Sequence, residues 1–555
     1  MKFLGEDVGD EAGRFRDDVV AAIALAGYDA ITPLIQSGMP MPAPAPDIFS
    51  LVPVLLALII SISLRNVIFG LFVGLFAGVL MIEGPALLGG MSLMVRDYLV
   101  PQVTDSYNAG VLVLLGFIGG FVALMERSGG GAAFAAKVTH FITTKARLQV
   151  SAWIGGIVIF FSDLGTPLII GPTFRPMADH LRVSRAKLAY IIDSTASPVA
   201  ILVPFIGWGV YIMSLLEQQF TTLGIEQSDF QALISAMPFQ FYAWLSLFAV
   251  PLLALTGVEF GPMARSERRA LREGLTATEG AASEVANSAA AQGVQQSAAS
   301  KARASFIWLP LLVLFVVLLW TLVPLGFPFG RISGADFRAG LSTAYLSAAA
   351  ALIVLMALTG AQRVMASVQM YLEGISRMML VAVMLLLAWA MGDMTTALGG
   401  DVYVATLAAE NAAPWALPVI IFLVSCSISF ATGSSWGTFA IMLPLALPAT
   451  VAIGAPLYVC IGAVLSGGLF GDHCSPISET TILSSTGAGC DPFEHFQTQL
   501  PYSLANGALC VMGYIAAGFT GAVWTLPVLL ALQLGGLLVL RRRINGVSVD
   551  LREQK

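Results

Sequence analysis

The chain has 555 residues, of which 57% are hydrophobic and 11% are charged, and its formal net charge is −6. A soluble protein carries roughly a quarter charged residues, so this composition excludes a soluble globular protein of this length. The negative charge also argues against a nucleic-acid partner, which would need clustered Lys and Arg. We therefore expect an all-α, polytopic membrane protein with the lipid bilayer as its main partner.

The N-terminal segment, residues 1–46, is acidic and then Pro-rich, with four prolines within Met39–Pro46. It has no basic start that leads into an apolar core, so we do not expect a cleavable signal peptide. Within it, Phe15–Ile35 is a candidate for an amphipathic helix that lies on the membrane surface. We treat these residues as a segment separate from the membrane region.

Apolar runs of about 20 residues, the length that crosses a bilayer as a helix, recur through the rest of the chain. They predict about 12 to 14 transmembrane helices in two regions, 47–258 and 306–541. The polar stretch 259–305 has no hydrophobic face and is expected to be a soluble linker. Basic residues occur in this linker and at Arg541–Arg543, where the last span ends and the tail 542–555 begins. They predict a cytoplasmic linker and C-terminus in a protein of the cell inner (plasma) membrane.

The two transmembrane regions resemble each other. Ser162–Thr166 and Ser434–Thr438 both end in Gly-Thr and are both followed by a proline seven residues after the glycine, and Asp193–Pro198 resembles Asp472–Pro476 further along. Many secondary transporters are built from such repeats and bind their cargo where helices are interrupted near the midplane. We therefore predict two structural repeats with interrupted helices at the midplane. Complete inverted repeats would place the linker and the C-terminus on opposite sides, against the charge pattern, and the sequence leaves that conflict open.

The candidate site is marked by acids in or beside the interrupted segments: Asp163, Asp193, Asp472 and Glu479. A charged side chain at the bilayer centre costs about 2.5 to 3.5 kcal/mol on insertion scales, so an acid kept there is a functional candidate. The nearby hydroxyl residues are Ser162, Thr166, Ser194, Ser197, Ser435, Thr438, Ser475, Ser478 and Thr480. Such oxygen ligands suit a small alkali cation, and a carboxylate also binds a proton. The sequence predicts competition between Na+ and H+, with Na+ at Asp193 and Asp472.

Structural explanations compete with this prediction. Ser and Thr in membrane helices more often bond their own backbone or a neighbouring helix, so most hydroxyls outside the acid clusters are expected to be structural. An intramembrane Asp could instead cap a half-helix N-terminus. Asp163 is the weaker candidate, because its repeat counterpart is Ser435. His473 is a candidate pH sensor, and a metal-ligand role is disfavoured because no second His lies nearby in the sequence.

At these residues the sequence resembles the NhaC family of Na+/H+ antiporters, over roughly residues 50 to 540. The motifs that carry the resemblance are Arg175–Asp179, Ser184–Pro198 and Gly471–Thr481. The resemblance implies a multi-span secondary transporter with cation-binding acids in its paired interrupted helices. Glu479 stands where the family usually has Asp, and His473-Cys474 replaces a form of the motif that contains Lys, which marks a variant branch.

We expect a secondary active transporter that exchanges Na+ for H+ by alternating access, with no enzymatic activity and no cofactor beyond the transported ions. The alternative is a Na+- or H+-coupled carrier of a small organic acid or amino acid. A basic residue deep in the site would favour that alternative, and Arg175 and Lys187 are expected to lie too near the surface. A membrane enzyme has little support, because the sequence shows no metal-spaced His cluster, Walker loop or Ser-His-acid set. A homodimer is left open.

Overall fold

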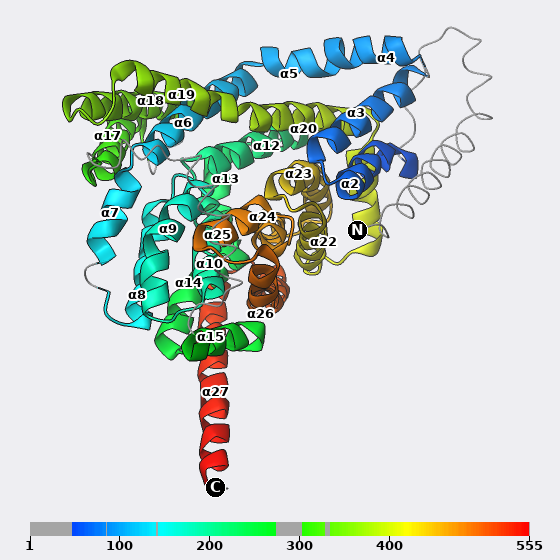
Figure 1. Ribbon diagram of the computed structural model, residues 1–555. Coiled ribbons are helices and arrows are strands. Elements are labelled where there is room, and N and C mark those ends of the chain that lie inside the picture. The colour runs from blue at the N-terminus through cyan, green and yellow to red at the C-terminus, as the bar shows by residue number, and fades with distance from the viewer. Residues whose placement is uncertain (1–46, 85, 140–141, 274–301, 328–332, 554–555) are drawn as a thin grey trace, which may run out of the picture.

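A computed structural model describes the chain from residue 47 to residue 553, apart from residues 85, 140–141, 274–301 and 328–332 (Figure 1). Every regular element in this described part is a helix, and it contains no strand. The all-α prediction is therefore confirmed. The predicted surface helix at 15–35 lies outside the described residues.

The first half consists of helices that are repeatedly interrupted at Gly, Pro and polar residues. In chain order they are η1 (Ile48–Leu51), α2 (Val52–Leu64), α3 (Val67–Glu83), α4 (Leu87–Leu93), η2 (Met94–Leu99), α5 (Val100–Thr104), α6 (Ser106–Arg127), α7 (Gly130–Thr139), α8 (Lys145–Val158), α9 (Gly165–His180), α10 (Arg185–Asp193), α11 (Ser197–Ala200), α12 (Gly207–Leu223), α13 (Asp229–Ala236), η3 (Met237–Phe239) and α14 (Phe241–Thr256). The helix α15 (Gly261–Glu273) follows at the start of the predicted linker.

The second half contains fewer described elements, and its helices reach 29 residues. They are α17 (Ser305–Leu322), η5 (Val323–Leu325), α18 (Gly334–Leu358), α19 (Val364–Arg377), α20 (Met379–Ala397), α21 (Gly400–Asn411), α22 (Leu417–Thr432), α23 (Ser435–Ala452), α24 (Leu457–Cys474), α25 (Glu479–Ala488), α26 (Pro492–Thr520) and α27 (Thr525–Glu553). The last helix, α27, extends beyond the rest of the bundle toward the C-terminus (Figure 1).

The repeat is clearest in α9 and α23. Each begins beside a Gly-Thr pair and carries two internal prolines, Pro172 and Pro176 in α9 and Pro444 and Pro448 in α23. A proline inside a helix removes a backbone donor, which membrane proteins tolerate where neighbouring groups satisfy the freed carbonyl. The matched interruptions confirm the prediction of two structural repeats with broken helices. The exact limits of the predicted segments stay a prediction.

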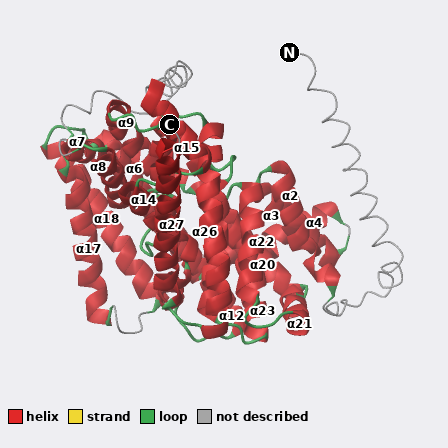
Figure 2. Ribbon diagram, turned by 90° about the horizontal axis from the view of Figure 1, so that it is seen from below, coloured by secondary structure: helices red, strands yellow, loops and turns green. Residues whose placement is uncertain are grey.

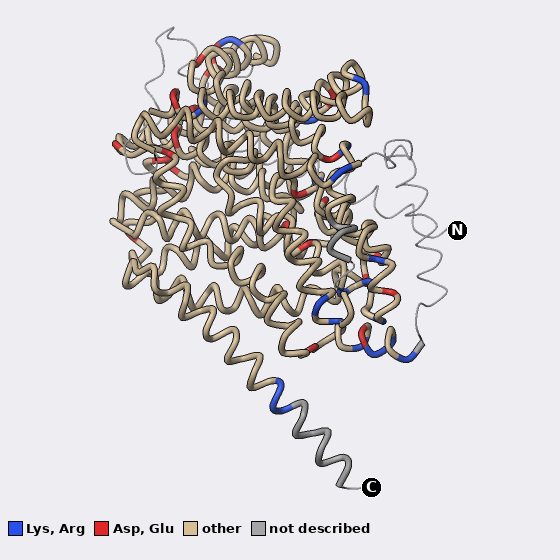
Figure 3. The backbone as a smooth tube through the Cα atoms, turned by 90° about the vertical axis from the view of Figure 1, so that its left-hand side faces the viewer, with Lys and Arg blue, Asp and Glu red and all other residues tan. Residues whose placement is uncertain are grey.

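Eight helices of the described chain are long and apolar enough to cross a membrane, or up to ten if two bent pairs each count as one span. The apolar stretch Ile48–Leu64 and helix α22 are shorter. The sequence-based count of about 12 to 14 spans also includes such short and interrupted helices, which explains the difference. Most of the backbone tube in Figure 3 carries neither acid nor base, and the charged residues gather mainly toward its borders. The protein is a multi-pass membrane protein.

The two halves are interleaved rather than side by side. Helix α6 packs against α18 and α19, while α20 packs against α3. Close approach depends on glycine: a Cβ at Gly70 in α3 would lie 2.5 Å from the Ala57 carbonyl oxygen of α2, as the small-residue spacing in this helix predicts. Figure 2 shows α15 and the end of α27 toward the same border of the bundle.

Candidate functional site

The two predicted helix breaks meet where α9, α10, α24, α25 and α26 pack together. Helices α9 and α25 touch through their backbones at Gly171 and Gly487, and a Cβ on either glycine would overlap the backbone of the other helix. Helix α10 packs against α9, α25 and α26. This packing brings Asp193, at the end of α10, beside the segment that follows Asp472 in α24.

Asp193 is fully buried and lies among side chains of the second half. From α25, the hydroxyls of Thr481 and Ser484 lie 3.4 Å from its Oδ2 and Oδ1, respectively. From α26, Gln499 Nε2 donates to Oδ2 at 2.8 Å, and His495 Nε2 lies 3.3 Å from the same oxygen. Every neighbour that holds this carboxylate comes from the other repeat, so the site exists only when the two halves are together.

Asp472 is 6% exposed and has fewer partners. The Ser478 hydroxyl donates to its Oδ1 at 2.9 Å. Its Oδ2 accepts no hydrogen bond from the residues that the structure describes, although the Ser197 hydroxyl lies nearby. Asp163 and Asp193 are both close enough to interact electrostatically with this carboxylate. A second buried carboxylate with an open oxygen therefore lies in the same region as Asp193.

Backbone carbonyls at the end of α24 add to these oxygens. In a continued helix the Asp472 carbonyl would accept from the N–H of residue 476, but residue 476 is proline and has none. Instead, the hydroxyls of Thr480 and Thr481 both lie 3.4 Å from this carbonyl oxygen. The neighbouring His473 carbonyl accepts from Gln499 Nε2. The sequence break thus presents two main-chain oxygens to the same side chains that surround Asp193.

His473 is buried, with both ring nitrogens engaged: Nε2 lies 3.0 Å from the Ser194 hydroxyl and Nδ1 lies 3.0 Å from the Tyr242 hydroxyl. The ring therefore connects α24 to the turn after α10 and to α14. Its predicted role as a pH sensor stays a prediction.

Several predicted site hydroxyls lie outside this group and bond elsewhere, as the structural alternative expects. Ser162 donates to Glu126 Oε1, Thr166 to the Ser162 carbonyl, Ser435 to the Gly468 carbonyl, Thr438 to the Ser434 carbonyl and Ser475 to the Phe430 carbonyl. Asp163 accepts from Trp208 Nε1 at 2.9 Å. Glu479 is exposed in the first turn of α25 and interacts electrostatically with Asp163.

Four residues of the site were not among the predicted ligands: Thr481, Ser484, His495 and Gln499. Their spacing carries a signal that the sequence analysis missed. Thr481 and Ser484 are three residues apart in α25, and His495 and Gln499 are four apart in α26, so each pair shares one helix face. Polar pairs at that spacing in otherwise apolar helices indicate a common partner.

Lys187 is placed differently from its expectation. It was expected near the surface, but it is fully buried and forms an ion pair with Glu259 at 2.8 Å. Its ammonium group also lies over the rings of Tyr190 and Tyr502, at 5.2 and 5.5 Å from their centres. Burial of a lysine requires such compensation. Its charge is already paired, so it is not a free cation for a substrate carboxylate.

The described start of the predicted linker is docked rather than detached. In α15, Glu267 accepts from the backbone N–H of Ser184 at 2.7 Å, at the beginning of α10. Arg269 forms an ion pair with Glu494 in α26, and Met263 of the same helix is fully buried. Helix α15 therefore ties together the ends of two helices that build the site.

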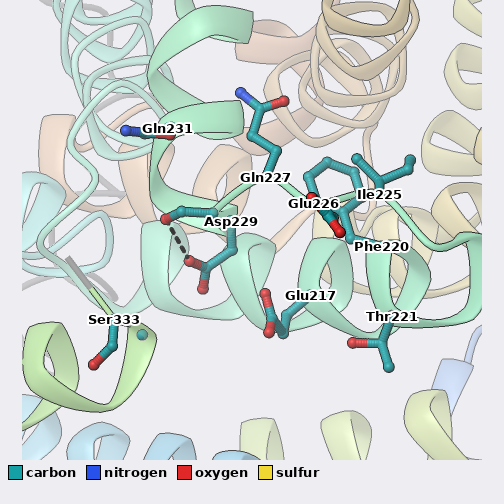
Figure 4. Close-up of a pocket in the computed structure, with 11 residues that line it drawn as sticks. Glu217, Phe220, Thr221, Ile225, Glu226, Gln227, Asp229, Gln231 and Ser333 are labelled. Carbon is teal, nitrogen blue, oxygen red and sulfur yellow. Dashed lines mark hydrogen bonds between the residues drawn. The ribbon is translucent and has the colours of Figure 1, made fainter. Parts of the chain in front are cut away.

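A separate cavity of about 380 Å³ lies between α12, α13 and the start of α18 (Figure 4). Its lining includes Glu217, Glu226 and Asp229, and the Ser228 hydroxyl lies 3.3 Å from Asp229 Oδ1. None of the predicted site residues lines it. We therefore take the packed region around Asp193 and Asp472, and not this open cavity, as the candidate site.

Comparison with known proteins agrees with this architecture. An uncharacterised protein of Haemophilus influenzae is 31% identical over 85% of this chain and 91% of its own length. The malate-2H(+)/Na(+)-lactate antiporter of Bacillus subtilis is 36% identical, but only over 18% of this chain and 21% of its own length. The YdaH transporter of Alcanivorax borkumensis shares the fold, with a TM-score of 0.52 at 14% identity over 78% of this chain and 89% of the other. The profile of the Na+/H+ antiporter family matches residues 199–519, and the chain belongs to that family.

Proposed function

We propose that this protein is a secondary active transporter that exchanges Na+ for H+ across the cell membrane by alternating access. The observation that carries the proposal is the buried set of oxygens at the two helix breaks. It comprises the carboxylates of Asp193 and Asp472, the carbonyls of Asp472 and His473, and the hydroxyls of Thr481 and Ser484. Oxygen ligands of this kind suit a hard alkali cation better than they suit a soft metal.

The exchange follows from competition for the same carboxylates. A carboxylate binds either a proton or a cation, and a buried carboxylate that binds neither is costly. If the halves change their relative position only when the site is neutralised by one of the two ions, each inward step of one ion is matched by an outward step of the other. Because the partners of Asp193 all come from the second half, a relative movement of the halves changes its ligand set. No cofactor takes part.

The test is proton flux in proteoliposomes that contain a pH-sensitive dye, with pulses of Na+, Li+ or K+ and no organic solute. We expect Na+ to raise the internal pH of acid-loaded liposomes, and we expect the Asp193→Asn and Asp472→Asn variants to lose the response. Wild-type flux from either folded variant would remove that residue from the site. Asp401→Asn, a half-buried acid in the first turn of α21 and outside the site, is the control and should transport normally.

A coupled carrier of a small organic acid is the second candidate, because part of the chain resembles an antiporter whose name includes malate and lactate. Against it, the buried Lys187 is paired with Glu259 and offers no free charge to a carboxylate. In the same liposomes, proton or Na+ movement that begins only when malate, lactate or an amino acid is added would favour this candidate.

We also propose that the linker and the C-terminus face the cytoplasm. Support comes from the basic residues of both segments. It also comes from α15, at the start of the linker, and the end of α27, which lie toward one border of the bundle (Figure 2). Accessibility of a single cysteine placed at Gln554, in a background with the native cysteines removed, tests this in intact cells.

A further inference from the structure

Gln499 in α26 lies between two oxygens of the candidate site. Its Nε2 donates to Asp193 Oδ2 at 2.8 Å and also to the His473 carbonyl. The side chain is fully buried, and its Oε1 has no hydrogen-bond partner in the described part of the chain. The amide nitrogen therefore donates two hydrogen bonds, whereas the amide oxygen accepts none from the described residues.

The orientation of the amide follows from its neighbours. A carboxylate and a backbone carbonyl only accept hydrogen bonds, so the NH2 group and not the oxygen must face them. The same two oxygens are among those proposed to coordinate Na+. A cation that binds both of them needs the lone pairs that now receive the N–H groups, and it repels the positive end of the amide dipole. Na+ and Nε2 therefore compete for one position.

We propose that the Gln499 side chain has a different role in each of two states of the site. Without Na+, its amide nitrogen bridges Asp193 and the His473 carbonyl. When Na+ binds those oxygens, a half-turn of the amide brings Oε1 to the ion as a ligand. The inference rests on the proposed function and assigns a specificity-determining residue to the same site. It explains why a buried amide keeps an unused oxygen, because such groups are normally paired.

The neighbouring residues favour a half-turn of the Gln499 amide over movement of the whole side chain out of the site. His495, one turn earlier on the same face of α26, lies 3.3 Å from the same carboxylate oxygen, and the Gln499 side chain has no exposed surface. Rotation about the last side-chain bond exchanges the nitrogen and oxygen atoms within almost the same volume, because the two ends of the amide are nearly equal in size.

The experiment uses the full chain and compares Gln499→Leu, Gln499→Glu and the control Asn506→Leu at alkaline pH. Asn506 is a buried amide of the same helix that bonds Gln533 and Ser246 outside the site. Na+ binding is followed by the Na+-dependent shift in thermal unfolding in detergent, with choline as the control cation, and transport by proton flux in proteoliposomes. Loss of one ligand predicts that Gln499→Leu weakens apparent Na+ affinity by about tenfold while maximal flux stays within about twofold.

The Gln499→Glu variant distinguishes a Gln499 that coordinates Na+ from a Gln499 that only donates hydrogen bonds. Glutamate offers oxygen but no N–H, so Na+ affinity within about threefold of wild type supports the proposed ligand role. A Glu variant weaker than the Leu variant, or a Leu variant with wild-type Na+ affinity, overturns it. If Gln499→Leu does not fold, Gln499→Met, which is unbranched and has no oxygen, takes its place. A wild-type protein that shows no Na+-dependent shift or flux instead contradicts the proposed function itself.

Discussion

Asp193 and Asp472 come from equivalent positions of the two repeats, and their helices differ in composition and in length. Helix α10 has nine residues, all buried, and begins with Arg185 and Lys187, whereas α24 has eighteen residues and carries no charged residue before Asp472. Side chains of the other repeat surround the first carboxylate, while the second has one hydroxyl donor and an open oxygen. The comparison indicates that ion pairs hold the helix that leads to the first break, whereas the second break leaves a carboxylate oxygen without a partner among the described residues.

The charged beginning of α10 gives the largest expected effect. Replacing Lys187 by Met leaves the Glu259 carboxylate without its buried partner, and we expect a loss of about 3 kcal/mol in the free energy of unfolding. Unfolding of the purified protein in mixed micelles measures this change. The double variant Lys187→Met/Glu259→Gln should recover a large part of it, and equal stability of the single variant and the wild type would show that this pair does not hold α10.

The two carboxylates themselves should differ in stability. Polar contacts between membrane helices contribute about 0.6 kcal/mol each, so Asp193→Ala, with four neighbours to lose, is expected to cost about 2 kcal/mol and Asp472→Ala less than about 1 kcal/mol. The same unfolding measurement compares them. A larger loss of stability in Asp472→Ala than in Asp193→Ala would show that the second break, and not the first, is held more firmly by its contacts.

The two prolines offer a sharper test of the ligand role. Pro476→Ala restores an N–H that can pair with the Asp472 carbonyl, so we expect apparent Na+ affinity in proteoliposomes to fall by about tenfold. Pro198→Ala in the first break should change it by less than about twofold, because Pro198 lies in the first turn of α11, where a backbone N–H has no carbonyl partner within the helix. Equal effects of the two variants would mean that the breaks contribute alike.

The smallest effects are expected among the hydroxyls. Ser478→Ala removes the donor to Asp472 and should weaken Na+ affinity by about threefold, the equivalent of one such contact. Ser435→Ala removes only a bond to the Gly468 carbonyl, so it serves as the matched control and should stay near wild type. The concentration of Na+ at half-maximal flux measures both, and a stronger effect at Ser435 would return the Gly-Thr turns to the site.

Much of the architecture was accessible from the sequence, because apolar runs, prolines and the repeated motifs are local patterns. The same patterns located Asp193 and Asp472 at helix breaks. They did not locate His495 and Gln499, which lie on α26 and reach the site only through long-range packing. They also misplaced Lys187, because a basic residue near a predicted helix end resembles a surface residue until its partner Glu259 is known.

The proline at position 476 has a consequence for genetics. The oxygen whose helical N–H partner it removes belongs to the main chain of Asp472, and every amino acid placed at position 472 would carry the same carbonyl. A scan of single substitutions that scores growth in high sodium would therefore detect loss of the Asp472 carboxylate and of the His473 ring at those two positions. Loss of the Asp472 main-chain oxygen as a ligand would instead reduce growth in substitutions of residue 476. Poor growth of variants at this uncharged, chemically inert proline would indicate that a backbone carbonyl is a ligand.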